Sequence, residues 1–243
     1  MPDPLPIVLI PGLTCSARLY ADQIPALWRF GPVTVADHTR DDSMAAIARR
    51  ILAAAPPRFA LTGLSMGGYI AFEIMRQAPQ RVVKLALLDT GARAETPEQT
   101  ERRKVVIALA KNGRYAEVPD IAFPLYVHRS RHNDAGLKQT VRTMAAETGV
   151  EAFLRQQQAI ISRPDSRPSL GAIKCPTLVL VGDGDEATPP ELAREIAVAI
   201  GGARLVEIAD CGHLSTLERP EKLIAALVDW MNWLKRRPME EIR

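Results

Sequence analysis

Short apolar runs rich in β-branched residues alternate with longer amphipathic stretches along most of the chain. The runs that we expect to form strands are Pro6–Ile10, Pro32–Ala36, Arg58–Gly63, Val82–Asp89, Pro176–Gly182 and Ala203–Ala209. The run Val82–Asp89 is apolar at nearly every position, which is typical of a parallel strand that is covered on both faces. Strands that alternate with helices in this way predict an α/β fold with a doubly wound, mostly parallel sheet.

The amphipathic stretches between these runs carry signals for helix starts and ends. We expect helices at Ser43–Ala55, at Met66–Ala78, from Thr188 to about Gly201, and at Pro220–Arg237. Ser43 can cap the first of them, and Pro79 follows the second. Thr188 and Glu191 have the spacing of a capping box, which places the start of the third helix at Thr188.

One region interrupts the alternation of strands and helices. From residue 91 to residue 172 the pattern contains helical periods and no strand, with a capping box at Thr96 and helices expected at about 115–127, 135–148 and 150–161. Such a block between two strands predicts an inserted cap over the carboxyl ends of the strands, where α/β sheets bind ligands. We therefore expect a core of residues 1–90 and 173–243 and a helical cap of residues 91–172.

Composition excludes several classes of protein. The chain has 243 residues, 47% of them hydrophobic, which fits one globular unit with an insertion. Its net charge of +3 is too small to indicate a nucleic acid or a membrane surface as partner, and no apolar stretch reaches membrane length.

Cys15, Cys175 and Cys211 have no paired spacing, which favours a reducing, cytoplasmic location. No cluster has the spacing of a metal site, so we expect neither metal nor cofactor. The sequence gives no indication of the oligomeric state.

A serine flanked by glycines stands between an expected strand and an expected helix. The stretch Gly63-Leu64-Ser65-Met66-Gly67 has the form G-x-S-x-G, and this strand–turn–helix setting is typical of a nucleophile elbow. The glycines allow a turn too sharp for a β-carbon and leave the Ser65 hydroxyl exposed at the edge of the sheet. A serine at a helix start is also an ordinary cap, so the assignment depends on finding a base and an acid.

Candidates for the base and the acid follow in the order that an elbow requires, which is serine, acid, histidine. The four histidines are His38, His128, His132 and His213, and only His213 follows a late strand. Asp185 lies just after the strand before it. Asp183 and Asp89 are alternative acids, because Asp183 lies two residues before Asp185 and Asp89 ends the strand after the elbow helix. We expect Asp89 to accept hydrogen bonds from nearby loops. His128 and His132 lie in the expected cap, where surface or packing roles are favoured.

With these motifs the chain resembles the α/β-hydrolase fold family over nearly its whole length. A family pattern G-x-x-D-x-x-x-P matches Gly182–Pro189 and selects Asp185, and G-H-x-x-x-x-E-x-P-E matches Gly212–Glu221 and selects His213. The local motifs are most similar to small bacterial esterases, enol-lactonases and cofactor-free perhydrolases. The resemblance implies a serine hydrolase with Ser65 as nucleophile, His213 as base and Asp185 as acid.

The resemblance also implies two backbone donors for an oxyanion hole, the N–H groups of Met66 and Leu13. The family usually has His-Gly in the loop after the first strand, whereas this chain has Pro11-Gly12. A backbone donor survives that change, but the role of the histidine in holding the loop is lost. A second departure follows Asp37, where a glycine-rich turn of the family is replaced by the polar sequence DHTRDDSM.

The implied activity is hydrolysis of small carboxylic esters through an acyl-enzyme. Enol-lactonase, C–C bond hydrolase and cofactor-free perhydrolase remain alternatives because the same three residues serve them all, and a small-ligand receptor on this scaffold is the non-enzyme alternative. The partner is therefore a small ester or lactone. An excess of basic residues in the expected cap weakly favours an acidic substrate, and Ile121–Val127 can line an acyl pocket or pack inside the cap. We expect activity to rise with pH at about 6.5–7.5 as His213 loses its proton.

Overall fold

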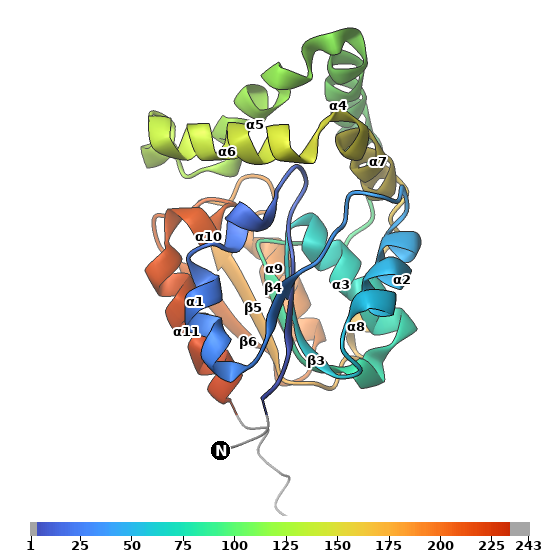
Figure 1. Ribbon diagram of the computed structural model, residues 1–243, viewed down its shortest axis with the longest axis vertical. Helices are drawn as coiled ribbons and strands as arrows, with labels where there is room; N and C mark the ends of the chain where they lie inside the picture. The colour runs from blue at the N-terminus through green and yellow to red at the C-terminus, as the bar shows by residue number, and fades with distance from the viewer. Residues whose placement is uncertain (1–3, 234–243) are drawn as a thin grey trace, which may run out of the picture.

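The computed structural model describes residues 4–233 and contains one six-stranded sheet with helices on both faces (Figure 1). The strands are β1 (Ile7–Ile10), β2 (Val33–Val35), β3 (Phe59–Leu64), β4 (Val82–Leu88), β5 (Thr177–Gly182) and β6 (Arg204–Ile208). Their spatial order is β2-β1-β3-β4-β5-β6, and every neighbouring pair is parallel. All six expected strands are confirmed, as is the α/β fold with a parallel sheet.

The helices connect these strands. They are α1 (Gln23–Leu27), α2 (Met44–Ala54), α3 (Met66–Gln77), α4 (Pro97–Leu109), α5 (Val118–Tyr126), α6 (Ala135–Thr148), α7 (Val150–Ile161), α8 (Arg167–Leu170), α9 (Pro190–Ala199), α10 (Ser215–Glu218) and α11 (Pro220–Asn232). Short 3₁₀ turns form η1 (Ala17–Tyr20), η2 (Trp28–Phe30), η3 (Pro79–Arg81), η5 (Tyr115–Glu117) and η6 (Arg129–Arg131), and a π turn forms η4 (Ala110–Arg114). No helix within residues 4–233 is long and apolar enough to cross a membrane.

Two helix ends differ from the sequence prediction. The capping box at Thr188 is wrong: α9 has Pro189 at its N-cap, and the Thr188 hydroxyl donates instead to the Asp185 carboxylate at 2.8 Å. A hydroxyl that already donates to a buried carboxylate makes a stronger hydrogen bond there than it would at a helix start. Helix α11 ends at Asn232, because Trp233 is extended. Residues 234–237 of the expected helix lie outside the described residues.

The four central strands, β1, β3, β4 and β5, bury both faces, so successive side chains along each of them point into opposite helical layers. Val8 and Ile10 of β1 pack in a cluster with α2, α3 and α9, whereas Ile7 and Leu9 pack in a second cluster with α1 and α11. This alternation follows from the two-residue period of a strand and explains why β1 is apolar at all four positions. The sheet is therefore held rigidly, and the loops at its carboxyl edge have a fixed base.

Helices α4 to α8 follow β4 and precede β5 in the chain. We call residues 91–172 the helical segment. The structure describes no strand there, and α4, α5, α6 and α7 lie beyond one end of the sheet in Figure 1. Phe123 of α5 and Met144 of α6 belong to the same apolar cluster as α1 and α11. Ala159 and Ile160 of α7 join the cluster on the opposite face. The helical segment thus shares both apolar clusters with the sheet.

Candidate active site

Ser65 occupies a sharp turn between β3 and α3. Its backbone has φ of 55° and ψ of −115°, a conformation that is uncommon for a residue with a side chain. A β-carbon on Gly63 would lie 2.3 Å from the Gly67 carbonyl oxygen, and one on Gly67 would lie 2.1 Å from the Ile10 carbonyl oxygen. Both glycines are therefore required for α3 to leave the sheet this closely. The Ser65 side chain makes no capping hydrogen bond to the helix.

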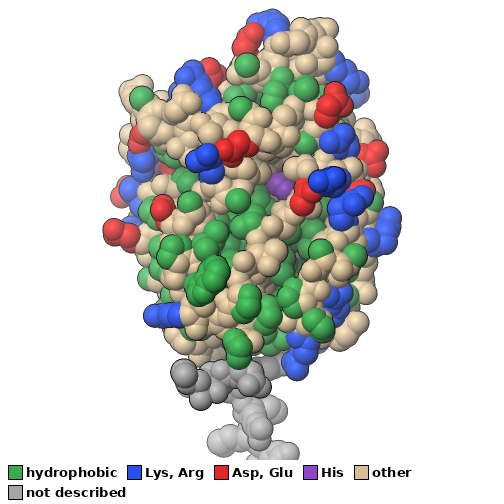
Figure 2. Space-filling view, in the orientation of Figure 1, with side chains coloured by type: hydrophobic (Ala, Val, Ile, Leu, Met, Phe, Trp, Pro, Cys, Tyr) green, Lys and Arg blue, Asp and Glu red, His purple; other side chains and the backbone are tan. Residues whose placement is uncertain are grey.

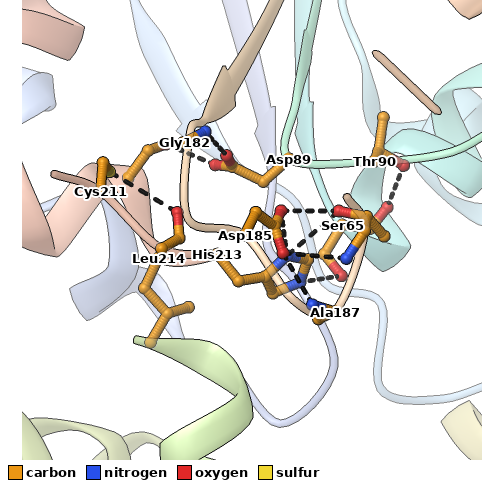
Figure 3. Close-up of polar contacts among 12 residues, drawn as sticks. Ser65, Asp89, Thr90, Gly182, Asp185, Ala187, Cys211, His213 and Leu214 are labelled. Atoms are coloured by element: carbon orange, nitrogen blue, oxygen red, sulfur yellow. Dashed lines mark hydrogen bonds and ion pairs between the residues drawn. The ribbon is translucent and has the colours of Figure 1, made fainter. Parts of the chain in front are cut away.

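The structure brings the three candidate residues together at the carboxyl edge of the sheet (Figure 3). Ser65 Oγ lies 2.8 Å from His213 Nε2, and His213 Nδ1 lies 2.8 Å from Asp185 Oδ2. They stand in the loops that follow β3, β6 and β5, respectively. The result is a continuous hydrogen-bonded chain from a hydroxyl through an imidazole to a carboxylate.

Asp185 is buried and is held on both of its oxygens. Oδ1 accepts from the backbone N–H groups of Ala187 at 2.9 Å and Thr188 at 2.8 Å. Oδ2 accepts from the Thr188 hydroxyl as well as from His213. A carboxylate held by this many donors cannot rotate freely, so it fixes the orientation of the imidazole.

His213 is in a setting that favours proton uptake. Burial lowers its pKa, but the negative charge of Asp185 and their hydrogen bond outweigh burial and leave the pKa raised above 6.5. Its backbone N–H donates to the Tyr126 carbonyl oxygen at 3.1 Å, and the two rings stack with centroids 5.5 Å apart. Tyr126 is thus a neighbour of the site that the sequence reasoning did not single out.

Asp89, one of the two alternative acids, is fully buried at the end of β4 but makes no hydrogen bond to His213. Its Oδ1 accepts from the Gly182 N–H at 3.0 Å, and its Oδ2 pairs with the Ser215 hydroxyl. Burial raises its pKa well above the ordinary value, and the charge of Asp185 raises it further. Asp89 therefore links the start of the Asp185 loop to the His213 loop, in keeping with the expected structural role.

The other alternative acid, Asp183, points elsewhere. Its Oδ1 accepts from the backbone N–H of Cys211 at 3.2 Å, and the residue is exposed. Of the three carboxylates considered from the sequence, Asp185 is the one that hydrogen-bonds to His213.

Glu218 supports the His213 loop and was given no role in the sequence reasoning. Its carboxylate accepts from the N–H groups of Gly212 at 3.0 Å, Leu214 at 3.3 Å and His128 at 2.8 Å. Burial raises its pKa, and these backbone donors oppose that shift. Glu218 is the glutamate of the pattern that selected His213, five residues after it. The backbone groups that Glu218 binds could be identified only from the fold.

The two backbone N–H groups proposed for an oxyanion hole belong to Met66, which directly follows Ser65, and to Leu13, which lines the same cavity as Ser65. Met66 is the first residue of α3, where a helix leaves its N–H groups without intrahelical partners. Leu13 lies in the loop after β1. Within residues 4–233, neither N–H donates a hydrogen bond. Both donors are therefore available to a negatively charged oxygen.

A small cavity opens next to Ser65. Its volume is about 20 Å³, close to that of a single water site. It is lined by Gly12, Leu13, Thr14, Cys15, Leu64, Ser65, Tyr126, Val141, Met144, His213 and Leu214. No Lys, Arg, Asp or Glu belongs to this lining among the described residues. Tyr126, Val141 and Met144 come from the helical segment, so that segment forms one wall.

His128, His132, Cys15 and Cys211 make no hydrogen bond to Ser65, His213 or Asp185 within residues 4–233. His128 pairs with the Ser130 hydroxyl at 2.7 Å, and His132 is exposed. Burial raises the pKa of the Cys15 thiol to about 12 and that of Cys211 further, so both thiols stay protonated at neutral pH. Within residues 4–233, no group of three or more His, Cys, Asp or Glu side chains is placed to hold a metal ion.

Comparisons with known proteins agree with this fold. A family model described as "Alpha/beta hydrolase family" matches residues 7–227. A Mycobacterium tuberculosis protein with the provisional name non-heme bromoperoxidase BpoC is 30% identical over 192 residues, which cover 74% of this chain and 70% of that protein.

Two solved structures share the architecture closely. A thermophilic esterase from Thermogutta terrifontis has a TM-score of 0.85 and 29% identity, covering 94% of this chain and 89% of its own. The enol-lactonase from Burkholderia xenovorans LB400 has a TM-score of 0.86 and 26% identity, covering 95% and 92%.

Proposed function

The chain belongs to the alpha/beta hydrolase family, and from this premise we propose that it is a serine hydrolase that cleaves small carboxylic esters. The observation that carries the proposal is the pair of 2.8 Å hydrogen bonds that join Ser65 to His213 and His213 to Asp185. A serine hydroxyl is a weak nucleophile until a base takes its proton, and this arrangement supplies that base.

In the proposed reaction, His213 Nε2 takes the Ser65 proton as Ser65 Oγ attacks the ester carbonyl carbon. The negative oxygen that forms is stabilised by the N–H groups of Met66 and Leu13. His213 then gives the proton to the leaving alcohol, and an acyl-enzyme remains on Ser65. Water attacks the acyl-enzyme with the same base, releasing the acid. Asp185 fixes the His213 tautomer and stabilises the imidazolium.

The cavity favours short, uncharged acyl groups. A space of about 20 Å³ leaves little room beside Ser65. A carboxylate on the substrate would find no basic side chain in the described lining. Basic residues of the helical segment instead pair with acidic residues, as Arg142 does with Asp120 and Arg114 with Glu117. Basic and acidic side chains are interspersed over the face of the molecule seen in Figure 2. The expectation of an acidic substrate thus receives no support from the cavity.

We also propose that the helical segment acts as the cap expected from the sequence. Tyr126 of α5 and Val141 and Met144 of α6 line the cavity, so this segment sets the length of the acyl group.

A test of the proposal is the turnover of p-nitrophenyl acetate by the wild-type protein and by the Ser65→Ala variant, with folding checked by circular dichroism. We expect the variant to lose activity by at least about 10⁴-fold, because the attacking atom is absent. Ser162→Ala, an exposed serine of the helical segment, is the matched control and should keep full activity. Turnover by Ser65→Ala near the wild-type rate would refute the proposal.

Lactones are a second candidate substrate class, favoured by the similarity to the Burkholderia enol-lactonase. A lactone is a cyclic ester, and the same attack by Ser65 would open it. A panel of uncharged esters, carboxylate-bearing esters and lactones separates the classes. The panel should include a peracid assay with hydrogen peroxide in place of water as the second nucleophile. The highest kcat/KM should fall on an uncharged short-chain ester or lactone.

A further inference from the structure

The loop that carries Leu13 has an unfavourable backbone and needs support. It runs from Pro11 to Cys15 after β1, and Thr14 within it has φ of 57°, in the left-handed region that a threonine rarely adopts. The Thr14 hydroxyl donates to the Leu13 carbonyl oxygen at 2.6 Å. That bond lies within the loop and cannot anchor it to the rest of the fold. The position of the Leu13 N–H therefore depends on contacts from outside.

His38 supplies the first external contact. It follows β2, is buried, and places Nε2 2.9 Å from the Gly12 carbonyl oxygen. A carbonyl oxygen only accepts, so Nε2 carries the proton in this hydrogen bond. Burial lowers the pKa of His38 despite the opposing effect of the bond to Gly12, so the ring is neutral at neutral pH. The carbonyl it holds belongs to the peptide unit that contains the Leu13 N–H.

Gln156 of α7 supplies the second contact. Its side chain is fully buried, and Oε1 accepts from the Thr14 N–H at 3.1 Å. Its Nε2 has no hydrogen-bond partner within residues 4–233. Burying an amide with one end unpaired carries a free-energy cost. An apolar residue of the same size would not bury an unpaired amide. The hydrogen bond to Thr14 is therefore the one interaction described for Gln156 that needs a glutamine at this position.

The residue beside Gln156 extends the same connection. Arg155 Nε donates to the Thr39 carbonyl oxygen at 2.9 Å, and Thr39 follows His38 directly. Helix α7 therefore contacts both the loop after β1 and the loop that carries His38. The two loops and the helix form one connected unit around Leu13.

We propose that His38 and Gln156 are positioning residues that clamp the Gly12–Thr14 backbone and aim the Leu13 N–H at the oxygen on which negative charge develops. This inference rests on the proposed serine hydrolase function. Pro11 stands where related enzymes usually carry a histidine that supports this loop. His38 provides the missing support from the loop after β2. Gln156 adds a second support, from α7, so the Leu13 N–H is held partly by the helical segment. Neither residue needs to touch the substrate.

The first test replaces His38 by Leu, which removes the donor, and by Gln, which keeps an N–H at a similar reach. We expect kcat of His38→Leu to fall by roughly 10- to 100-fold with little change in KM, less than the 10²–10³ that loss of a whole oxyanion donor costs. His38→Gln should recover most of the rate. The affinity for a trifluoromethyl ketone, which forms a negatively charged adduct on the serine, should fall in parallel with kcat/KM. His132→Leu is the control for an exposed histidine.

The second test replaces Gln156 by Met, which keeps the volume and removes the acceptor. We expect a loss in kcat of about 10-fold or more with little net change in thermal stability, because the unpaired amide is gone while the buried Thr14 N–H loses its acceptor. Gln157→Met is the matched control: Gln157 is also buried on α7, but its Oε1 accepts from Arg103 rather than from the loop. It should keep kcat.

Wild-type kcat in a folded His38→Leu or Gln156→Met variant would overturn the clamp, and so would equal losses in Gln156→Met and Gln157→Met. If His38→Leu does not fold, His38→Gln and Gln156→Met decide the question. These outcomes are distinct from failure of the proposed function, in which Ser65→Ala would keep its turnover.

Discussion

Ser65 sits at the start of a helix but does not serve that helix as a cap. Its hydroxyl is 2.8 Å from His213 and makes no bond to the first turn of α3. The left-handed backbone at Ser65 is costly for a residue with a β-carbon, and it is retained at the point where the hydroxyl meets a base. The Thr90 hydroxyl donates to the Ser65 carbonyl oxygen at 2.8 Å and helps to hold this turn.

The identity of the acid can be tested by comparing Asp185→Asn with Asp89→Asn. Asp185→Asn should lower kcat by about 10⁴-fold, because an amide favours the wrong His213 tautomer. Asp89→Asn should lose less than about 10-fold, since an amide can still accept from Gly182 and donate to Ser215. Turnover of p-nitrophenyl acetate measures both. The reverse order of the two losses would show that Asp89 is the acid.

The same pair of variants has a pH signature. Catalysis needs neutral His213, and Asp185 raises its pKa, so wild-type activity should be lost as the pH falls through a midpoint above 6.5. Burial lowers that pKa, and Asp185 provides the largest of the opposing effects, ahead of Asp89 and Glu218. Removing the charge of Asp185 should therefore move the midpoint of residual activity to lower pH. A midpoint of Asp185→Asn equal to that of the wild type would contradict this account.

Residues whose motifs are local can be located from the sequence, whereas residues whose partners are distant in the chain cannot. Ser65 and His213 stand in patterns that can be recognised within ten residues. The contact of Gln156 with Thr14 joins residues 142 positions apart, and no periodicity or spacing records it. The polar loop after Asp37 had no assigned consequence, although it supplies His38, whose partner Gly12 lies in the loop after the neighbouring strand β1.

At the scale of elements, helix α6 decides how much space lies beside Ser65. Val141 and Met144 are three residues apart, so they share one face of α6, and both line the cavity. The sequence predicted this helix with its observed bounds, 135–148, but not which face meets the sheet. The stretch Ile121–Val127 shows the same limit: Tyr126 lines the cavity, Phe123 packs in the core and Ile121 is exposed.

Shortening Met144 should therefore change the preferred acyl length. In Met144→Ala the ratio of kcat/KM for p-nitrophenyl butyrate to that for the acetate should rise by about 10-fold or more, since each methylene in an apolar pocket is worth that much. Thr143→Ala, on the same helix but outside the lining, should leave the ratio unchanged. A ratio that stays constant in Met144→Ala would show that the longer chain binds elsewhere.

For the whole molecule, the shared apolar clusters bear on the two-part organisation expected from the sequence. The helical periodicity of residues 91–172 predicts an insertion, but periodicity does not show how closely an insertion packs against the core. Phe123 and Met144 pack with α1 and α11, and Ile160 packs with the opposite layer. Excising the helical segment would expose these faces, so we expect core and segment to fold together.

This expectation can be measured by hydrogen exchange at increasing denaturant concentration. Peptides from α6 and from β4 should become exchangeable at the same midpoint, because both are sealed by the same cluster. Far-ultraviolet circular dichroism should show a single transition at that midpoint. A separate, earlier transition confined to residues 91–172 would show that the segment is an independent unit.

The central claim is that Ser65 is the nucleophile, and covalent labelling tests it most directly. The protein is treated with a fluorophosphonate and digested with trypsin, and the peptide Phe59–Arg76, in which Ser65 is the only serine, is analysed by mass spectrometry. We predict a single phosphonyl adduct on Ser65 that is absent from the Ser65→Ala variant. A folded wild-type protein that carries no adduct, or one labelled at another residue, would contradict the account.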